Sequence, residues 1–181
     1  GQMYLFGGWD GENVLDIVLR YDPVEDRWAS MTPMPTARAY ASAASAGGKI
    51  YVIGGWDGIS TLDVNESYVP SRDREGESSW KSEEPIPADV IMMQSHSIAE
   101  LIFVFGTTKP KNVVMVQFSP QTEMWIQIDV REIFSDVESL NVSTQEGYFY
   151  CFGGFDRKGN YLSINMRYKV VYSLTVPNIT R

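Results

Sequence analysis

The chain has 181 residues, of which 44% are apolar, and a formal net charge of −8 at pH 7. This composition supports a buried core and differs from that of disordered chains. The negative charge argues against nucleic-acid binding, which requires a basic surface. The longest apolar runs, such as residues 101–105, are much shorter than a membrane span, so we also expect no membrane insertion.

One short pattern occurs four times along the chain, at residues 4–11, 50–58, 103–107 and 150–156. In each copy an apolar run stops at glycine, and an aromatic residue and an aspartate follow in three of them. The first glycines of successive copies are 47, 52 and 47 residues apart. The glycines are Gly7 and Gly8, Gly54 and Gly55, Gly106 alone, and Gly153 and Gly154. A period near 50 residues predicts an array of propeller blades.

Each copy predicts a strand that is buried on both faces and ends at a turn, because its apolar run is rich in β-branched and aromatic residues. The glycine pair suits a position where the backbone adopts positive φ or lies close to another backbone. The following Asp-Gly pairs, at 10–11 and 57–58, favour a tight turn into the next strand.

A pair of aromatic residues marks a second hairpin after the glycine strand. Six residues separate Tyr21 from Trp28, and six also separate Phe118 from Trp125. Eleven residues separate Tyr68 from Trp80, because the charged segment 72–79 lengthens that turn. We expect this insertion to be mobile, and we expect its deletion to leave the fold intact.

These residues together resemble the kelch repeat, with its glycine pair and its later Tyr and Trp. The resemblance implies an all-β, kelch-type β-propeller of about four four-stranded blades, at residues 1–33, 34–83, 84–129 and 130–181. The first blade lacks its inner strand, which gives about fifteen strands and predicts a partial ring; a closed four-blade ring is the alternative. Open blade faces then predict self-association.

The predicted strands after the first blade fall at regular positions. They lie at 39–46, 49–54, 62–69 and 79–83, then at 92–99, 101–105, 112–118 and 124–129, then at 139–144, 148–152, 161–168 and 170–176. Residues 130–137 are expected to form a single helical turn between the third and fourth blades.

In kelch propellers the loops between blades and between the second and third strands gather on one face. Here that loop face includes residues 109–111 and the following candidates for contact with a protein or peptide partner: Trp9, Asp10, Glu12, Asn13, Arg38, Tyr40, Trp56, Asp57, Phe155, Asp156 and Arg157. Aromatic and arginine side chains on rigid loops are typical anchors of protein interfaces. The recurring aspartates either cap turns or form a ring of acids for a cation or a basic partner.

The candidate residues for chemistry are few. A single histidine, His96, excludes the copper-radical oxidases of kelch-like fold, and no zinc or phosphate motif occurs. Cys151 is expected to be a buried thiol. We therefore expect a non-enzymatic module without cofactor or metal. The alternative is an enzymatic or carbohydrate-binding site in the channel, built from Ser42, Ser95, His96, Asn141 and Ser143. Resemblance to kelch adaptors implies a cytoplasmic protein, whereas resemblance to secreted bacterial kelch chains implies an extracellular one. The sequence does not distinguish between these two compartments.

Overall fold

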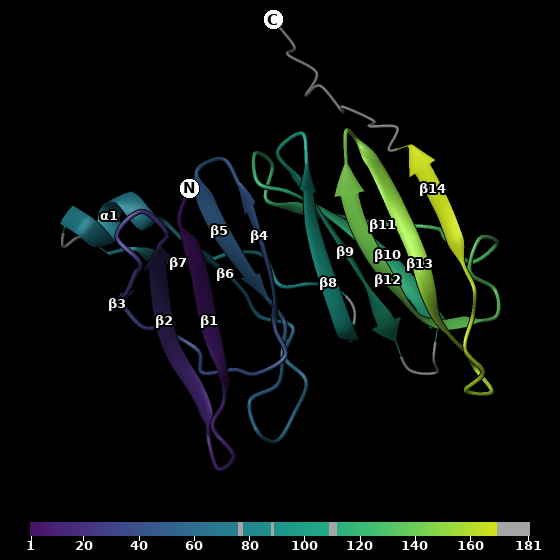
Figure 1. Cartoon of the computed structure of the whole chain (residues 1–181), viewed down its shortest axis with the longest axis horizontal. Coiled ribbons are helices and arrows are strands. Elements are labelled where there is room, and N and C mark those ends of the chain that lie inside the picture. Colours follow the sequence, from purple (N-terminus) through teal and green to yellow (C-terminus); the bar gives the residue numbers. More distant parts are fainter. Residues whose placement is uncertain (76–77, 88, 109–111, 170–181) are drawn as a thin grey trace, which may run out of the picture.

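The computed structural model describes residues 1–75, 78–87, 89–108 and 112–169. They form four antiparallel sheets that spread as an open fan (Figure 1). Sheet 1 contains β1 (Met3–Trp9), β2 (Val14–Asp22) and β3 (Arg27–Ser30). Sheet 2 contains β4 (Ser42–Ala46), β5 (Lys49–Ile53), β6 (Asn65–Tyr68) and β7 (Trp80–Ser82). Sheet 3 contains β8 (Val90–Ile98), β9 (Leu101–Thr108), β10 (Asn112–Ser119) and β11 (Met124–Ile128). Sheet 4 contains β12 (Val137–Gln145), β13 (Tyr148–Asp156) and β14 (Asn165–Lys169).

This arrangement confirms the predicted all-β propeller architecture. Within each sheet, strands that are consecutive in sequence are also neighbours. The first strands of sheets 2, 3 and 4 pack against one another, as expected for inner strands. Sheets 1 and 4 lie at opposite ends of the fan (Figure 1), so the four sheets form an open partial ring. The predicted strand at 170–176 lies outside the described residues.

The apolar strand before each glycine contributes to two interfaces, because successive side chains of a strand point to opposite faces. In β5, Val52 packs with Val18 and Met34 of the sheet 1 side. Its neighbours Tyr51 and Ile53 pack toward sheet 3 instead. This alternation confirms that the strand is buried on both faces, and it makes every sheet depend on its neighbours.

In sheets 2 and 3, the tryptophan of the outer strand joins the sheet to the preceding one. In sheet 2, the ring of Trp80 packs on Tyr68 with centroids 5.0 Å apart, and its indole N–H donates to the Thr32 carbonyl at 3.1 Å. In sheet 3, Trp125 packs on Phe118 at 4.9 Å and donates to the Glu84 carbonyl at 2.9 Å. The paired aromatics therefore have the inter-blade role that the sequence suggested.

The glycine pairs adopt the positive φ that was predicted for them, at 59° and 120° for Gly7 and Gly8. The single glycine of the third copy, Gly106, is instead part of a continuous strand that extends to Thr108. Thr107, which replaces the second glycine, is buried and donates its hydroxyl to the Glu138 carbonyl at 2.6 Å. Between sheets 3 and 4, the Phe134 N–H bonds to the Val130 carbonyl at 3.0 Å, which forms the expected helical turn.

The inserted segment differs from the prediction that it is mobile. Residues Pro70–Glu75 form helix α1, and this helix is attached to the neighbouring sheet. The Asp73 carboxylate accepts hydrogen bonds from the backbone N–H of Thr32 at 3.0 Å, from its hydroxyl at 2.5 Å, and from the Tyr68 hydroxyl at 2.5 Å. Because Thr32 follows sheet 1 and Tyr68 belongs to sheet 2, the insertion links two sheets.

We expect Asp73→Ala to lower the free energy of unfolding by about 1–3 kcal/mol, because hydrogen bonds to a charged group are lost. Burial opposes the charge of Asp73, but its bonds to Thr32 and Tyr68 hold its pKa below the ordinary 3.8. The stabilisation is therefore present above pH 3.8 and is lost as the pH falls through the lower, folded-state pKa. Urea unfolding at several pH values measures this, with the exposed Glu25→Ala as the control. Equal stability of Asp73→Ala and wild type at pH 7 would contradict it.

Candidate functional site

The loop face is formed by the connections β1–β2, β5–β6 and β13–β14, which lie on the same, lower side of the fan in Figure 1. The linker that enters β4 lies against two of them. Its Arg38 carbonyl accepts the Gly8 N–H at 3.0 Å, and its Ala39 exchanges two backbone hydrogen bonds with Trp56. The loop at 109–111 is outside the described residues.

The three recurring aspartates cap the turns of these loops. Asp10 Oδ1 accepts the N–H groups of Glu12 and Asn13 at 2.8 and 2.7 Å. The corresponding bonds are 2.8 and 2.7 Å at Asp57 and 2.8 Å each at Asp156. Backbone hydrogen bonds lower the pKa of Asp10 and Asp57, and the Asn160 side chain does so first for Asp156. Of the two interpretations in the sequence, turn capping therefore accounts for their placement.

Tyr40, which is exposed, and Trp56, which is partly buried, form an aromatic pair on the loop face. Their ring centroids are 6.3 Å apart. Tyr40 is 72% exposed and has a φ of 56°, a left-handed conformation that is unfavourable for a bulky residue. Trp9, at the end of β1, is also exposed. Outlying backbone conformations of this kind concentrate at binding and active sites.

An acidic recess of about 700 Å³ lies next to the aromatic pair. One of its lining residues is Thr61, which pairs with Trp56 in an isolated β-bridge. The remaining lining residues are Leu62, Asp63, Glu84, Pro85, Ile86, Pro87 and Asp89. Three of the eight are acidic, none is basic, and the three carboxylate residues are exposed. The recess therefore presents negative charge to a partner.

The prediction that Arg38 contacts a partner is wrong. The residue is 1% exposed and therefore does not belong to the contact surface. Its guanidinium is paired with Glu66 and donates to the carbonyls of Thr36, Gly54 and Val64, each at 3.2 Å. A buried guanidinium requires such partners. The residue therefore joins the linker to β5 and β6 and has a structural role.

The remaining loop candidates lie apart from the aromatic pair, on sheet 4. Phe155 and Asp156 are partly buried, and Arg157 is exposed and donates to the Asn112 side chain at 2.7 Å. The structure therefore divides the predicted residues into a cluster on sheets 1 and 2 and a separate group on sheet 4.

Two of the proposed channel residues form a hydrogen bond between neighbouring blades. Ser42 and Ser95 share a hydrogen bond of 2.7 Å between β4 and β8. His96 Nε2 is buried without a hydrogen-bond partner, and burial lowers the pKa of His96. Asn141 and Ser143 are exposed on β12. A hollow of about 10 Å³ lies against β8 and β12; Gln94, Ser139 and Leu140 are among its lining residues, and none of these five candidates lines it.

Cys151 is fully buried on β13, as expected, and burial raises the pKa of its thiol to about 11. No group of three or more His, Cys, Asp or Glu residues suited to a metal ion occurs in the part of the chain that the structure describes. The thiol is therefore protonated at neutral pH and surrounded by apolar side chains.

We expect Cys151 to resist an aromatic disulfide reagent in the folded protein at pH 8. Only the thiolate reacts, and a pKa of about 11 leaves roughly one thiol in a thousand ionised at that pH. The measurement compares the reaction rate in buffer with that at a urea concentration that unfolds the protein. Rapid, complete labelling without urea would contradict the buried position.

Sequence reasoning missed several residues of the loop face. Ile59 and Tyr161 are 90% and 93% exposed at loop tips, and both follow a glycine closely, a signal that marks the turn without revealing the exposure. Asp63, Glu84 and Asp89 were missed because they meet only where the linker after β7 folds onto the β5–β6 connection, with the Ile86 N–H bonded to the Asp63 carbonyl at 2.9 Å.

No helix among the described residues has the length and apolar character of a membrane span.

Residues 1–35 and 37–82 match the Kelch motif. The chain is 32% identical over 159 residues, or 88% of its length, to mouse Kelch-like protein 35, and spans 26% of that relative. Over 49 residues, 27% of the chain, it is 45% identical to human Kelch-like protein 35, where the match spans 8% of the relative. With four sheets in an open propeller arrangement and these matches, the chain belongs to the kelch-repeat family.

Proposed function

We propose that this chain is a non-enzymatic binding module that holds an extended, basic segment of a partner protein on its loop face. Kelch repeats are in general protein-interaction modules. The observation that carries the finer proposal is the Tyr40–Trp56 pair, with its exposed Tyr40 ring, bordering the acidic recess.

The two parts of this surface suit the two parts of a lysine or arginine side chain. Aromatic rings attract a cation positioned over their faces and pack against its methylene groups. The carboxylates of Asp63, Glu84 and Asp89 supply negative charge at the recess. Tyrosine and tryptophan are also the residue types that contribute most binding energy at interfaces. The Tyr40 ring is accessible to a partner, because the residue is 72% exposed.

A screen of displayed random peptides against the intact chain tests the proposal. Selected peptides are expected to be rich in lysine or arginine, to bind at least tenfold more weakly to Tyr40→Ser, and to lose affinity in high salt because exposed charges are screened. Tyr161→Ser, on the separate group of sheet 4, is the matched control and should retain binding. Peptides without basic residues, or equal binding by both variants, would overturn the proposal.

We also propose that the chain self-associates through the apolar outer face of sheet 1. This face exposes Met3, Leu5, Ile17 and Trp28. Leu5 occupies the position of Val52 in the next repeat, which is 1% exposed because it packs against the preceding sheet. The uncovered face of sheet 1 therefore has the apolar character of an inter-blade interface.

Light scattering on a concentration series measures this self-association. We expect the wild-type chain to form oligomers, and the double variant Leu5→Lys, Ile17→Lys to shift toward monomer, since two charges oppose burial of the face. Ile59→Lys, at an exposed loop tip, is the control and should not change the distribution. A wild-type chain that stays monomeric up to its solubility limit contradicts the proposal.

A further inference from the structure

Met92 takes the same place in the third repeat as Tyr40 in the second. Each residue lies fourteen positions before the first glycine of its repeat, Gly54 or Gly106. Both have a left-handed backbone, with a φ of 56° at Tyr40 and 53° at Met92. Both are also largely exposed, at 72% and 55%. Two successive repeats therefore present a large side chain to solvent at the same point of the fold.

A tight turn does not explain the left-handed backbone at these two positions. The other described non-glycine residues with positive φ all lie in the short connections of hairpins; they are Asp26, Ala99, Glu100, Glu123 and Glu146. Tyr40 instead comes two residues before β4, and Met92 is inside β8. This conformation is unfavourable for a bulky residue. Outliers of this kind concentrate where a side chain is held in place for a ligand.

A β-bulge sets the direction of the Met92 side chain. In the ladder between β8 and β9, Met92 and Met93 lie opposite the single residue Gly106. Bulges redirect side chains and are over-represented next to active sites. Here the Met93 side chain packs against Gly54 of the preceding repeat, whereas Met92 is exposed. Because Gly54 is two residues before Trp56, this contact holds the start of β8 next to the aromatic pair.

Met92 lies on the loop face, near the acidic recess. The start of β8 is beside the end of β9, as the start of β4 is beside the end of β5, and β9 ends on the lower side of the fan (Figure 1). The serine hydrogen bond joins β4 to β8. Asp89 of the recess is three residues before Met92, so their Cα atoms are at most about 11 Å apart. The recess, the aromatic pair and Met92 therefore lie together on one face.

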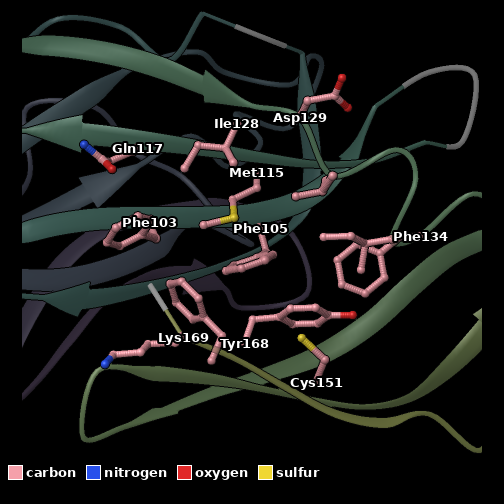
Figure 2. A pocket seen from close by; sticks show the side chains of 13 residues that line it. Phe103, Phe105, Met115, Gln117, Ile128, Asp129, Phe134, Cys151, Tyr168 and Lys169 are labelled. Atoms are coloured by element: carbon pink, nitrogen blue, oxygen red, sulfur yellow. The ribbon is translucent and has the colours of Figure 1, made fainter. Parts of the chain in front are cut away.

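Methionine inside the fold has a different role. Met115 lines the apolar pocket between sheets 3 and 4, together with Phe103 and Phe105 (Figure 2). It is only 7% exposed, and it fills space in the core, as methionine commonly does. On a surface, methionine instead offers an adaptable apolar contact and is over-used where varied partners bind. The exposed Met92 is of this second kind.

We propose that the segment bound by the loop face carries a large apolar side chain, such as leucine, close to its basic residue, and that this apolar side chain binds on Met92. The proposal rests on the function proposed above, in which the recess takes the basic residue. Side chains two positions apart in an extended segment point the same way and are about 7 Å apart. The distance from the recess to Met92 therefore places the apolar residue two or four positions from the basic one.

Parallel selections from one library of displayed random peptides, on the intact wild-type chain and on its variants, test this contact. We expect peptides selected on wild type to be at least threefold enriched in apolar residues two or four positions from a lysine or arginine. Peptides selected on Met92→Ser should keep the basic residue and lose this apolar enrichment, because the buried apolar contact is gone. Met124→Ser is the matched control, at a methionine that is 61% exposed on β11, and should select the same peptides as wild type.

A second variant guards against a folding defect at this position. Glycine adopts positive φ without a steric penalty, so Met92→Gly removes the side chain and leaves the backbone unstrained. Its urea midpoint should stay near that of wild type, and its selected peptides should match those of Met92→Ser. The most frequent wild-type peptide, measured by fluorescence anisotropy, should bind Met92→Gly at least fivefold more weakly.

The possible failures of the two proposals differ. Equal apolar enrichment on wild type and on both Met92 variants would overturn the contact at Met92 and leave the basic segment of the loop face standing. The same holds if Met124→Ser loses the enrichment as Met92→Ser does. Wild-type peptides without basic residues would overturn the function proposed for the loop face, and with it the combined motif. Apolar enrichment at all positions, unrelated to the basic residue, would also contradict a defined contact.

Discussion

Arg38→Met is expected to lower the free energy of unfolding by about 3–5 kcal/mol, because it removes one partner of a buried ion pair and leaves the other charge uncompensated. Arg38 and Glu66 are 1% and 4% exposed. Burial lowers the pKa of Arg38 and its pairing with Glu66 raises it. Methionine keeps the unbranched, apolar part of the side chain, so the change reports mainly on the guanidinium.

The loss of stability extends beyond the ion pair, because Arg38 also donates hydrogen bonds to backbone carbonyls. Its donors bond to the carbonyls of Gly54 and Val64, at the end of β5 and just before β6. Glu66 accepts a second hydrogen bond from the Thr36 hydroxyl at 2.8 Å. Without the guanidinium these acceptors remain buried and partly unsatisfied, which adds to the cost.

Urea unfolding measures the effect as a lower midpoint with an unchanged slope. Arg131→Met is the matched control, because Arg131 pairs with Asp129 at an exposed site, where such pairs contribute little; its midpoint should stay near that of wild type. The double variant Arg38→Met, Glu66→Met should be more stable than Arg38→Met alone, as both charges are absent. An Arg38→Met midpoint equal to that of the Arg131 control would show that the pair is dispensable.

The architecture was predictable because its main signals are local and repeated. The glycine pairs marked positions of positive φ near the ends of the second strands, and the aromatic pairs marked the second hairpins, in which Tyr68 pairs with Trp80 and Phe118 with Trp125. Each of these roles depends on backbone conformation or on packing that recurs at a fixed spacing. The helix of the insertion escaped prediction, because Asp73 owes its order to Thr32, a residue 41 positions away.

The candidate site was only partly predictable. The exposed Tyr40 and Trp9 and the partly buried Trp56 were named from their loop positions, and the aspartates were recognised as possible turn caps. Arg38 was misassigned because an arginine in a linker looks exposed in sequence, whereas its partner Glu66 is 28 residues away and becomes adjacent only in the fold. The acidic recess combines the β5–β6 connection with the linker after β7, two segments that are separate in sequence, so it has no local sequence pattern.

Gly7→Ala and Gly154→Ala are expected to destabilise the protein by about 3 kcal/mol or more, and by more than alanine at the other glycine of each pair. A Cβ at position 7 would overlap the carbonyl oxygen of Arg38, whereas a Cβ at Gly8 would meet nothing within 4 Å. In the fourth copy the order is reversed. There a Cβ at Gly154 would overlap the Ser139 carbonyl, and one at Gly153 would approach only the Leu162 oxygen, at 3.8 Å.

This reversed order distinguishes two possible causes of the destabilisation, which are close contact with another part of the backbone and backbone strain at the glycine itself. The first glycine of each pair has a φ near the left-handed helical value, at 59° and 55°, and the second has a larger φ, at 120° and 95°. If strain alone decided the cost, the second glycine would be the more sensitive one in both copies, since non-glycine residues avoid its φ more strongly. Close contact with a carbonyl oxygen, that of Arg38 in the linker at Gly7 and that of Ser139 in β12 at Gly154, predicts sensitivity at the first glycine of sheet 1 and at the second glycine of sheet 4. Unfolding midpoints of the four single variants decide between these accounts, and the same order in both sheets would refute the one based on contact.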